Sequence, residues 1–342
     1  METRKIQVTG KSTYVVSLPK KWVTKVNIKN GDSVVLFPLP DNTLLINPNL
    51  AEKERPQTKM VIMLNTDDVD EMLRRFVGAY LAGYSIIEFR SQTDLPMTVR
   101  QRIRRISQFV IGPQIIEESS TSISFKDMLD ASDFSMSKAV KRMQLITLDM
   151  LKESMRMLKD GKGRGEDMHF RDDEVDKLYW MITKQFYRVL RDALFADKMH
   201  MTSQEAMSYL LIARSVERMA DHALKINNNA QDLNGGVAIA KELEDMVQRI
   251  GALSDDVLNA FFRGRHDQSF DLVARAQGII SELEKMKQGL LSDGTAAKVV
   301  VPLAYIIDSL ERIASYAEDI AEISINHQFV QEYDQALMRN TV

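Results

Sequence analysis

The chain has 342 residues, of which 44% are hydrophobic and 27% charged, and it contains no cysteine. This composition indicates a folded protein of two or three domains, and it excludes a disordered or collagen-like chain, a disulfide framework and thiolate chemistry. Residues 1–30 hold seven Lys or Arg against one acid, a charge of +6, whereas the whole chain carries −3, so the other 312 residues carry −9. A basic arm on an acidic body predicts that one end of the molecule meets a polyanion.

The sequence also favours a soluble, cytoplasmic protein. The first residues are charged, which is unlike a secretory signal peptide. The longest apolar run, residues 299–307, includes Pro302 and is far shorter than the ~18 residues of a membrane span. We therefore expect a chain that is not membrane-embedded.

Residues 3–48 are predicted to form a hairpin, a helical turn and a second hairpin. The expected elements are strands at 5–9 and 13–18, a helix at 19–26, and strands at 33–37 and 43–46. Pro19 suits the first helical position because its φ is fixed, and Gly31 supplies the positive φ of a tight turn. A unit under about 50 residues rarely encloses a core of its own, so we expect it to dimerise.

This segment resembles the AbrB/SpoVT swapped-hairpin DNA-binding fold. The resemblance rests on Gly10-Lys11, on a strand that ends in Leu18-Pro19-Lys20-Lys21-Trp22, and on the turn Asn30-Gly31-Asp32. It implies that residues 1–50 form an interleaved homodimer that presents basic side chains to double-stranded DNA. The cations that would meet phosphates are Arg4, Lys5, Lys11, Lys20, Lys21 and Lys25. The alternative is that these side chains form a solvated face without a ligand.

After a polar linker at residues 50–57, the chain alternates between β and α elements up to residue 130. The expected elements are strands at 59–64, 85–89, 114–117 and 122–125, and helices at 69–82 and 96–110. In the second helix Val99, Ile103, Ile106 and Val110 form one apolar stripe. We therefore expect residues 57–130 to be a small α/β domain, to which the sequence assigns no role.

From residue 132 to residue 330 the chain is predicted to be helical. Six segments separated by short polar joints are expected at 136–160, 168–197, 203–230, 238–263, 266–291 and 296–327. Short joints between long helices make neighbouring helices antiparallel in a bundle. The predicted fold class is therefore multidomain α+β, with a swapped-hairpin β domain, a small α/β unit and a helical C-terminal part.

An internal repeat divides the helical part into two. Val216-Glu217-Arg218-Met219-Ala220-Asp221-His222-Ala223 recurs 94 residues later as Leu310-Glu311-Arg312-Ile313-Ala314-Ser315-Tyr316-Ala317. Six helices with such a repeat predict a pair of stacked three-helix bundles. This part resembles the PhoU family of phosphate-uptake regulators, whose third-helix signature reads roughly E-R-[IM]-[AG]-D-H-A. An AbrB-like head joined to such bundles is similar to archaeal phosphate-uptake regulators.

Carboxylates at helical spacing mark a candidate metal site. Glu217 and Asp221 lie four apart, and like charges so placed repel by about 0.2–0.5 kcal/mol, which a hard cation or an Arg-rich partner would relieve. The family resemblance implies sites for divalent or ferric ions, and the matching positions are Asp172, Asp173, Asp176, Glu217, Asp221 and Glu311. In the second repeat Ser315 replaces the aspartate, which weakens the match there. The alternative is an ion-paired surface, with the acids near residue 172 opening a helix.

The sequence contains no catalytic constellation. The five histidines do not cluster, and no Walker loop, G-x-G-x-x-G or G-x-S-x-G pattern is present. A carboxylate-bridged di-iron enzyme is disfavoured because its Glu-x-x-His pairs are missing. We therefore expect a protein that is not an enzyme and that has no organic cofactor.

Two functions remain open. The first is a phosphate-responsive regulator whose head binds DNA near phosphate-uptake genes while the helical part senses or relays phosphate status. The second is an adaptor that negatively regulates a phosphate transporter ATPase or a sensor kinase by protein contact, with a head that only dimerises. The concentration of positive charge in residues 1–30 favours the first, because an adaptor has no need of it.

Overall fold

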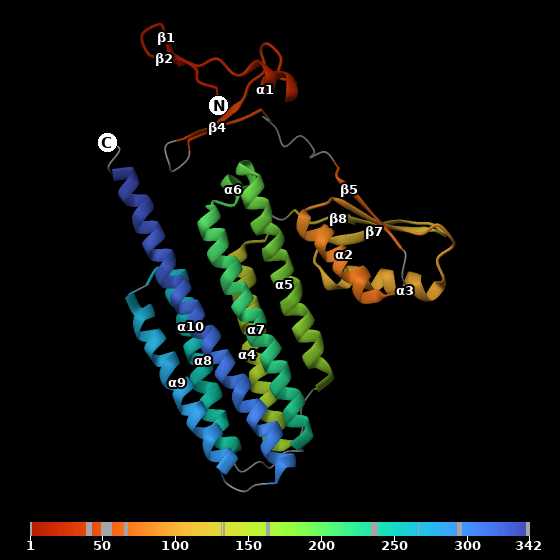
Figure 1. Cartoon of the computed structure of the whole chain (residues 1–342), viewed down its shortest axis with the longest axis vertical. Helices are drawn as coiled ribbons and strands as arrows, with labels where there is room; N and C mark the ends of the chain where they lie inside the picture. Colours follow the sequence, from red (N-terminus) through yellow and green to blue (C-terminus); the bar gives the residue numbers. More distant parts are fainter. Residues whose placement is uncertain are drawn as a thin grey trace. The chain divides into compact units, whose positions relative to one another are not determined.

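The computed structural model describes residues 2–38, 43–48, 57–64, 68–130, 132, 134–161, 165–233, 239–265, 267–292 and 296–339. The chain divides into two compact units, residues 58–332 and residues 1–57 together with 333–342. We call residues 1–57 the head, residues 58–130 the α/β unit, and the helices from residue 136 onward the body. The mixed α+β class expected from the sequence is confirmed (Figure 1).

The head has the predicted order of hairpin, helix and hairpin. Strand β1 (Gln7–Thr9) pairs antiparallel with β2 (Thr13–Val15), helix α1 (Lys20–Lys25) follows, and β3 (Val35–Pro38) pairs antiparallel with β4 (Leu44–Asn47). Gly31 has the expected positive φ, +92°. Pro19 differs from the prediction: it precedes the first helical residue, with an extended ψ of 123°.

The described residues of the head include no buried side chain. Several apolar side chains of its first hairpin are instead largely exposed, among them Tyr14 at 75%, Ile6 at 68% and Val8 at 61%. A single copy of the head therefore has no hydrophobic core within its described part, as its small size predicted.

The α/β unit is a four-stranded sheet with two helices on one face (Figure 1). Its elements are β5 (Lys59–Met63), α2 (Val69–Ala82), β6 (Ile86–Arg90), α3 (Met97–Ile106), β7 (Pro113–Glu118) and β8 (Ser122–Asp127). The strand order is β5-β6-β8-β7; β5 runs parallel to β6, and the other pairs are antiparallel. The predicted stripe of Val99, Ile103, Ile106 and Val110 is buried, as expected.

The body consists of seven helices in its described residues. They are α4 (Met136–Asp160), α5 (Gly165–Arg191), α6 (Ala193–Lys198), α7 (Ser203–Leu233), α8 (Ala240–Arg263), α9 (Asp267–Ser292) and α10 (Ala297–Arg339). One predicted helix, 168–197, is divided in two, because the Asp192 side chain caps a new helix by accepting a hydrogen bond from the Phe195 N–H. No described helix is long and apolar enough to cross a membrane.

The two sequence repeats meet at equivalent positions. Helices α4, α5 and α7 pack together as the first three-helix bundle. Helix α8 contacts α4 of this bundle and α9 of the second bundle. His222 of α7 and Tyr316 of α10, which are 94 residues apart, face each other with ring centroids 5.9 Å apart. One continuous hydrophobic core runs through both three-helix bundles, from Met136 to Ala321.

The α/β unit packs on helix α5, so the two parts expected as domains 57–130 and 132–330 form one compact unit. Trp180 of α5 contacts the cores of both. Further along the same helix, Lys184 forms an ion pair with Asp127 of β8, and Arg191 donates to the Ala82 carbonyl at 2.8 Å.

Candidate functional site

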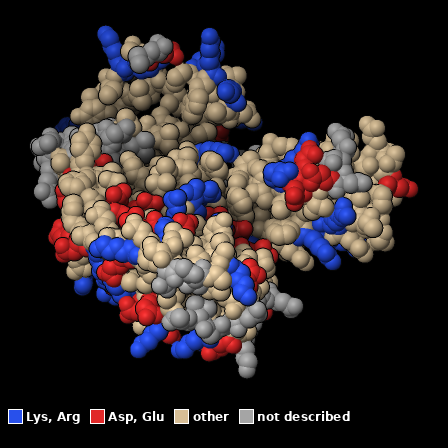
Figure 2. All heavy atoms as spheres, turned by 60° about the horizontal axis from the view of Figure 1, so that its bottom comes forward, with Lys and Arg blue, Asp and Glu red and all other residues tan. Residues whose placement is uncertain are grey.

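The cations predicted to bind DNA are all exposed. Arg4 and Lys5 precede β1, Lys11 lies in the turn between β1 and β2, and Lys20, Lys21 and Lys25 lie on α1. Arg4 pairs with Glu2, whereas the other five make no ion pair among the residues that the structure describes. Lys and Arg side chains project from the head at the top of Figure 2. Within the described part of the chain, these five lysines thus remain available to an external anion.

Five of the six carboxylates predicted as metal ligands come together between α5 and α7. Asp172, Asp173 and Asp176 lie on α5, and Glu217 and Asp221 lie on the antiparallel α7. The spacing of four on each helix places the acids on facing stripes where these helices pack. We call these five residues the carboxylate cluster.

Burial and mutual repulsion raise the pKa of three members of the carboxylate cluster. Burial, with the charges of Asp221 and Asp173, raises the pKa of Asp172 to about 6. Burial, with the charges of Asp172 and Glu217, raises the pKa of Asp176 to about 7. The pKa of Glu217 is raised by burial and then by Asp221. The charged form of the cluster therefore lacks sufficient positive charge around it.

Two nearby arginines contact aromatic residues. Arg214 donates to the Tyr179 hydroxyl at 3.1 Å, and the Arg218 guanidinium lies 5.8 Å from the Tyr316 ring centroid. The Glu217 Oε2 atom is buried and has no hydrogen-bond partner among the described residues. A buried carboxylate oxygen without a donor is costly, which makes it a fit acceptor for a ligand that carries positive charge.

The donor chemistry of the cluster fits a hard cation, because all its ligating atoms are carboxylate oxygens. Its side chains are not in ligating positions, however. In the described part of the chain, no three His, Asp or Glu side chains lie close enough together to hold a metal ion. A cation would therefore have to draw these side chains inward.

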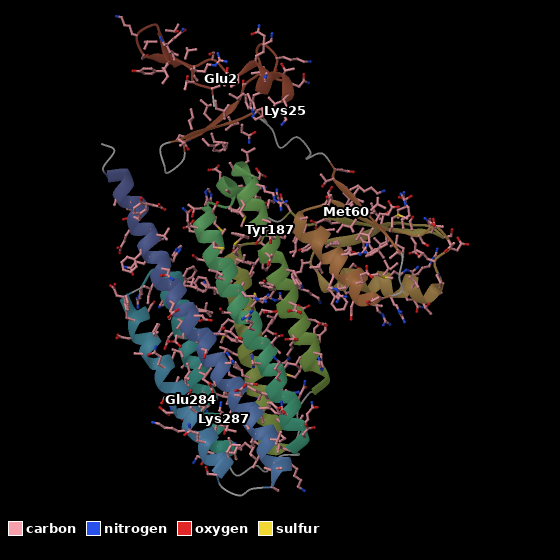
Figure 3. The ribbon with its side chains drawn as sticks, viewed as in Figure 1. Glu2, Lys25, Met60, Tyr187, Glu284 and Lys287 are labelled. Atoms are coloured by element: carbon pink, nitrogen blue, oxygen red, sulfur yellow. The ribbon has the colours of Figure 1, made fainter. Side chains whose placement is uncertain are left out.

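Glu311, the sixth predicted ligand, lies on α10 in the second repeat and is paired with a lysine. Lys287, where α9 runs beside α10, places its ammonium 2.8 Å from Glu311 Oε2 and 3.5 Å from Asp308 Oδ1 (Figure 3). The hydrogen bond to Glu311 raises the pKa of Lys287. In the second repeat a lysine of the chain itself thus neutralises the acids. Sequence reasoning missed this residue, because only packing brings α9 against α10.

His222 also does not join the cluster as a ligand, in agreement with its position on the helix. Burial lowers its pKa to about 4, and its ring lies beside Tyr316. The side chain is therefore neutral near pH 7 and belongs to the contact between the two repeats.

Two parts of the chain match known protein families. Residues 140–230 match the PhoU domain, and residues 7–57 match the family described as antidote-toxin recognition MazE, bacterial antitoxin. The PhoU match spans most of α4, α5 and α7, the repeat that contains the carboxylate cluster. The chain therefore carries a PhoU domain and a MazE/AbrB-type head, and both predicted resemblances are confirmed.

One solved structure supports the fold of the body, and a second is reported beside it. PhoU from Pseudomonas aeruginosa is similar with a TM-score of 0.51 and 20% identity, over 56% of this chain and 94% of that one. The phosphate transport system regulatory protein PhoU from Streptococcus pneumoniae has a TM-score of 0.43 and 18% identity, over 56% and 93% of the two chains. No curated protein sequence matches the chain. At these identities the likeness concerns the fold alone.

Proposed function

We propose that this protein is a phosphate-responsive regulator that binds double-stranded DNA near phosphate-uptake genes through its head. The observation that carries the proposal is a set of five exposed lysines without ion-pair partners in the described part of a head that is joined to a PhoU domain. Lysines that neutralise phosphates release counterions, which supplies affinity for any DNA sequence. The helical body would sense or relay phosphate status.

The head would act as a homodimer. Its exposed apolar side chains, such as Ile6, Val8 and Tyr14, would be covered by a second copy. Two copies would also double the number of cations on the DNA-binding face, which strengthens binding to a polyanion.

The carboxylate cluster would hold a divalent or ferric ion in the first repeat. Asp172, Asp176, Glu217 and Asp221 would be the principal ligands, with Asp173 beside them. The bound ion would supply the positive charge that these acids lack. The orphan Glu217 Oε2 and the raised pKa values of three members of the cluster support this assignment.

The alternative function is that of an adaptor that negatively regulates a phosphate transporter ATPase or a sensor kinase. The observation in its favour is that a head without a buried side chain in its described residues needs a partner even if it never meets DNA. In this case the lysines would be solvated, and the acidic body would provide the docking surface.

The test is the salt dependence of DNA binding. Lys20→Ala with Lys21→Ala should weaken binding to all duplexes and flatten the slope of log affinity against log salt by about 1.8, since each phosphate contact contributes about 0.9. Fluorescence anisotropy with a phosphate-uptake promoter and a scrambled duplex measures both. Lys241→Ala with Lys298→Ala removes the same charge from exposed positions of the body and should leave the slope unchanged.

Two results would contradict the regulator. If wild-type protein binds the promoter no better than the scrambled duplex, no operator is recognised. If the slope is the same for the Lys20 and Lys21 variant as for wild type, those lysines do not meet phosphates, and the adaptor is favoured.

A further inference from the structure

The two edges of the α/β sheet are protected to different degrees. The edge strand β7 begins with Pro113, has a register shift between Ile115 and Glu117, and ends in two glutamates. Proline, bulges and charges are the devices by which natural sheets prevent pairing with another chain. The opposite edge strand, β5, has an unbroken register with β6, no proline and one charged residue, Lys59. That lysine is already paired with Glu88.

The side of β5 that faces away from β6 has a regular set of main-chain groups. The Thr58 carbonyl accepts from the Ile86 N–H at 3.0 Å, and the Leu64 N–H donates to the Arg90 carbonyl at 2.8 Å. Because successive residues of a strand alternate, the even-numbered residues direct their main-chain groups at β6. The N–H and C=O groups of Lys59, Val61 and Met63 therefore point away from the sheet.

The side chains of this edge are also apolar. Val61 is 37% exposed and Met63 is 38% exposed, at the centre and at the end of a strand of five residues. An edge strand with a β-branched residue at its centre, no bulge and one paired charge is a template for strand addition.

We propose that β5 pairs antiparallel with β5 of a second copy of this chain, across a two-fold axis at Val61. Val61 then faces its own copy, and Lys59 of each chain faces Met63 of the other, so no like charges are opposed. Each of these facing pairs exchanges two N–H···O bonds. The two four-stranded sheets become one continuous sheet. Such an interface is isologous, as a dimer with two-fold symmetry requires.

The choice of a second copy as the partner rests on the proposed head dimer. β5 begins two residues after the end of the head, so heads that dimerise deliver two β5 strands to the same neighbourhood. The eleven steps from residue 48 to residue 59 span at most about 40 Å, which keeps the local concentration of the second strand high.

Disulfide mapping in the full-length chain tests the pairing, since the protein contains no cysteine of its own. In the proposed register the Val61 Cα atoms are about 5.5 Å apart, within the range of about 4.4–6.8 Å that a disulfide accepts. Val61→Cys should therefore form a covalent dimer under mild oxidation at least about tenfold faster than the control Gln114→Cys, which is exposed on the other edge strand.

Two further measurements separate the failure of this pairing from the failure of the head dimer. Light scattering of wild-type protein reports the dimer itself. A dimer in which Val61→Cys is oxidised no faster than Gln114→Cys would overturn the pairing and leave the head dimer standing. A monomer would overturn both. Hydrogen exchange of the wild type needs no variant: the amides of Lys59, Val61 and Met63 should be protected, and rapid exchange there would also refute the pairing.

Discussion

Replacing Asp127 by Ala is expected to lower the free energy of unfolding by about 3–5 kcal/mol, because it leaves the buried ammonium of Lys184 without a counter-charge. Lys184 is 8% exposed and forms an ion pair with the carboxylate of Asp127. Its ammonium also lies 4.2 Å from the centroid of the Tyr80 ring. Burial lowers the pKa of Lys184, against the opposing effect of Asp127. Burying the charged ammonium of Lys184 thus costs free energy, and the ion pair with Asp127 offsets that cost.

The position of this ion pair makes the effect a global one. Lys184 belongs to α5 of the body, and Asp127 ends the last strand of the α/β unit. Tyr80 of α2 completes the contact by donating to the Ile111 carbonyl at 3.0 Å. Losing the pair weakens the packing of the α/β unit on the helix that also carries Asp172 and Asp176.

Denaturant unfolding followed by Trp180 fluorescence measures the loss, in a Trp22→Phe background that leaves Trp180 as the one tryptophan. Asp127→Asn keeps the shape of the side chain and should cost almost as much as Asp127→Ala, since the missing charge is the cause. Asp127→Ala combined with Lys184→Met should recover most of the stability, because a buried pair replaced by apolar groups is often neutral.

An exposed ion pair serves as the control. Glu282→Ala removes the nearer of two carboxylates paired with Arg249, which is 38% exposed, 2.5 Å from Glu282 and 3.9 Å from Asp245. This change should cost less than about 1 kcal/mol. If Asp127→Ala lowers the free energy of unfolding no more than Glu282→Ala does, the Lys184 ammonium reaches water in the folded protein and is not a buried charge.

Features set by neighbouring residues could be predicted from the sequence, whereas features set by contacts between distant residues could not. Helix α2 begins and ends where expected because Asp68 caps its first turn and Gly83 follows it with a φ of 87°. These signals lie within four residues of the helix ends. The division of α5 from α6 was missed because an apolar pattern continued across Asp192, whose capping role depends on a local change of direction.

The candidate site follows the same rule. The family resemblance implied one set of ligands from Asp172 and Asp176 on α5 and Glu217 and Asp221 on α7, and the spacing of four on each helix places these acids on facing stripes. The ion pair of Glu311 with Lys287 was not predictable, since the lysine lies on a different helix. The partnership of Lys184 with Asp127 joins residues 57 positions apart and left no pattern in the sequence.

The carboxylate cluster should make the metal-free protein less stable as the pH rises from about 4 to about 7. The folded-state pKa values of Asp172 and Asp176, about 6 and about 7, lie above the ordinary value of 3.8. Over this interval the folded chain binds more protons than the unfolded chain, so the free energy of unfolding falls with increasing pH. Allowing for the solvent screening of these half-buried groups, we expect a loss of about 2 kcal/mol.

The measurement is urea unfolding of chelator-treated protein at a series of pH values from 4 to 8. Asp172→Asn with Asp176→Asn should remove this part of the pH dependence. Glu242→Gln with Asp271→Asn changes two exposed carboxylates elsewhere in the body and should preserve it. A wild-type profile identical to that of the Asp172 and Asp176 variant would mean that these acids titrate as they do in the unfolded chain.

Addition of a hard cation at pH 8 should reverse the loss, because a ligand that binds only the folded state at 100 times its Kd stabilises it by about 2.7 kcal/mol. Mg²⁺, Mn²⁺, Ca²⁺ and Fe³⁺ are the ions to compare, with elemental analysis after dialysis as a second readout. Glu217→Gln with Asp221→Asn should abolish both effects. The Lys287 ammonium already neutralises Glu311, so Glu311→Gln should leave the bound ion in place. If no cation stabilises the wild type, the cluster is not a metal site, and an Arg-rich partner is left to supply its missing positive charge.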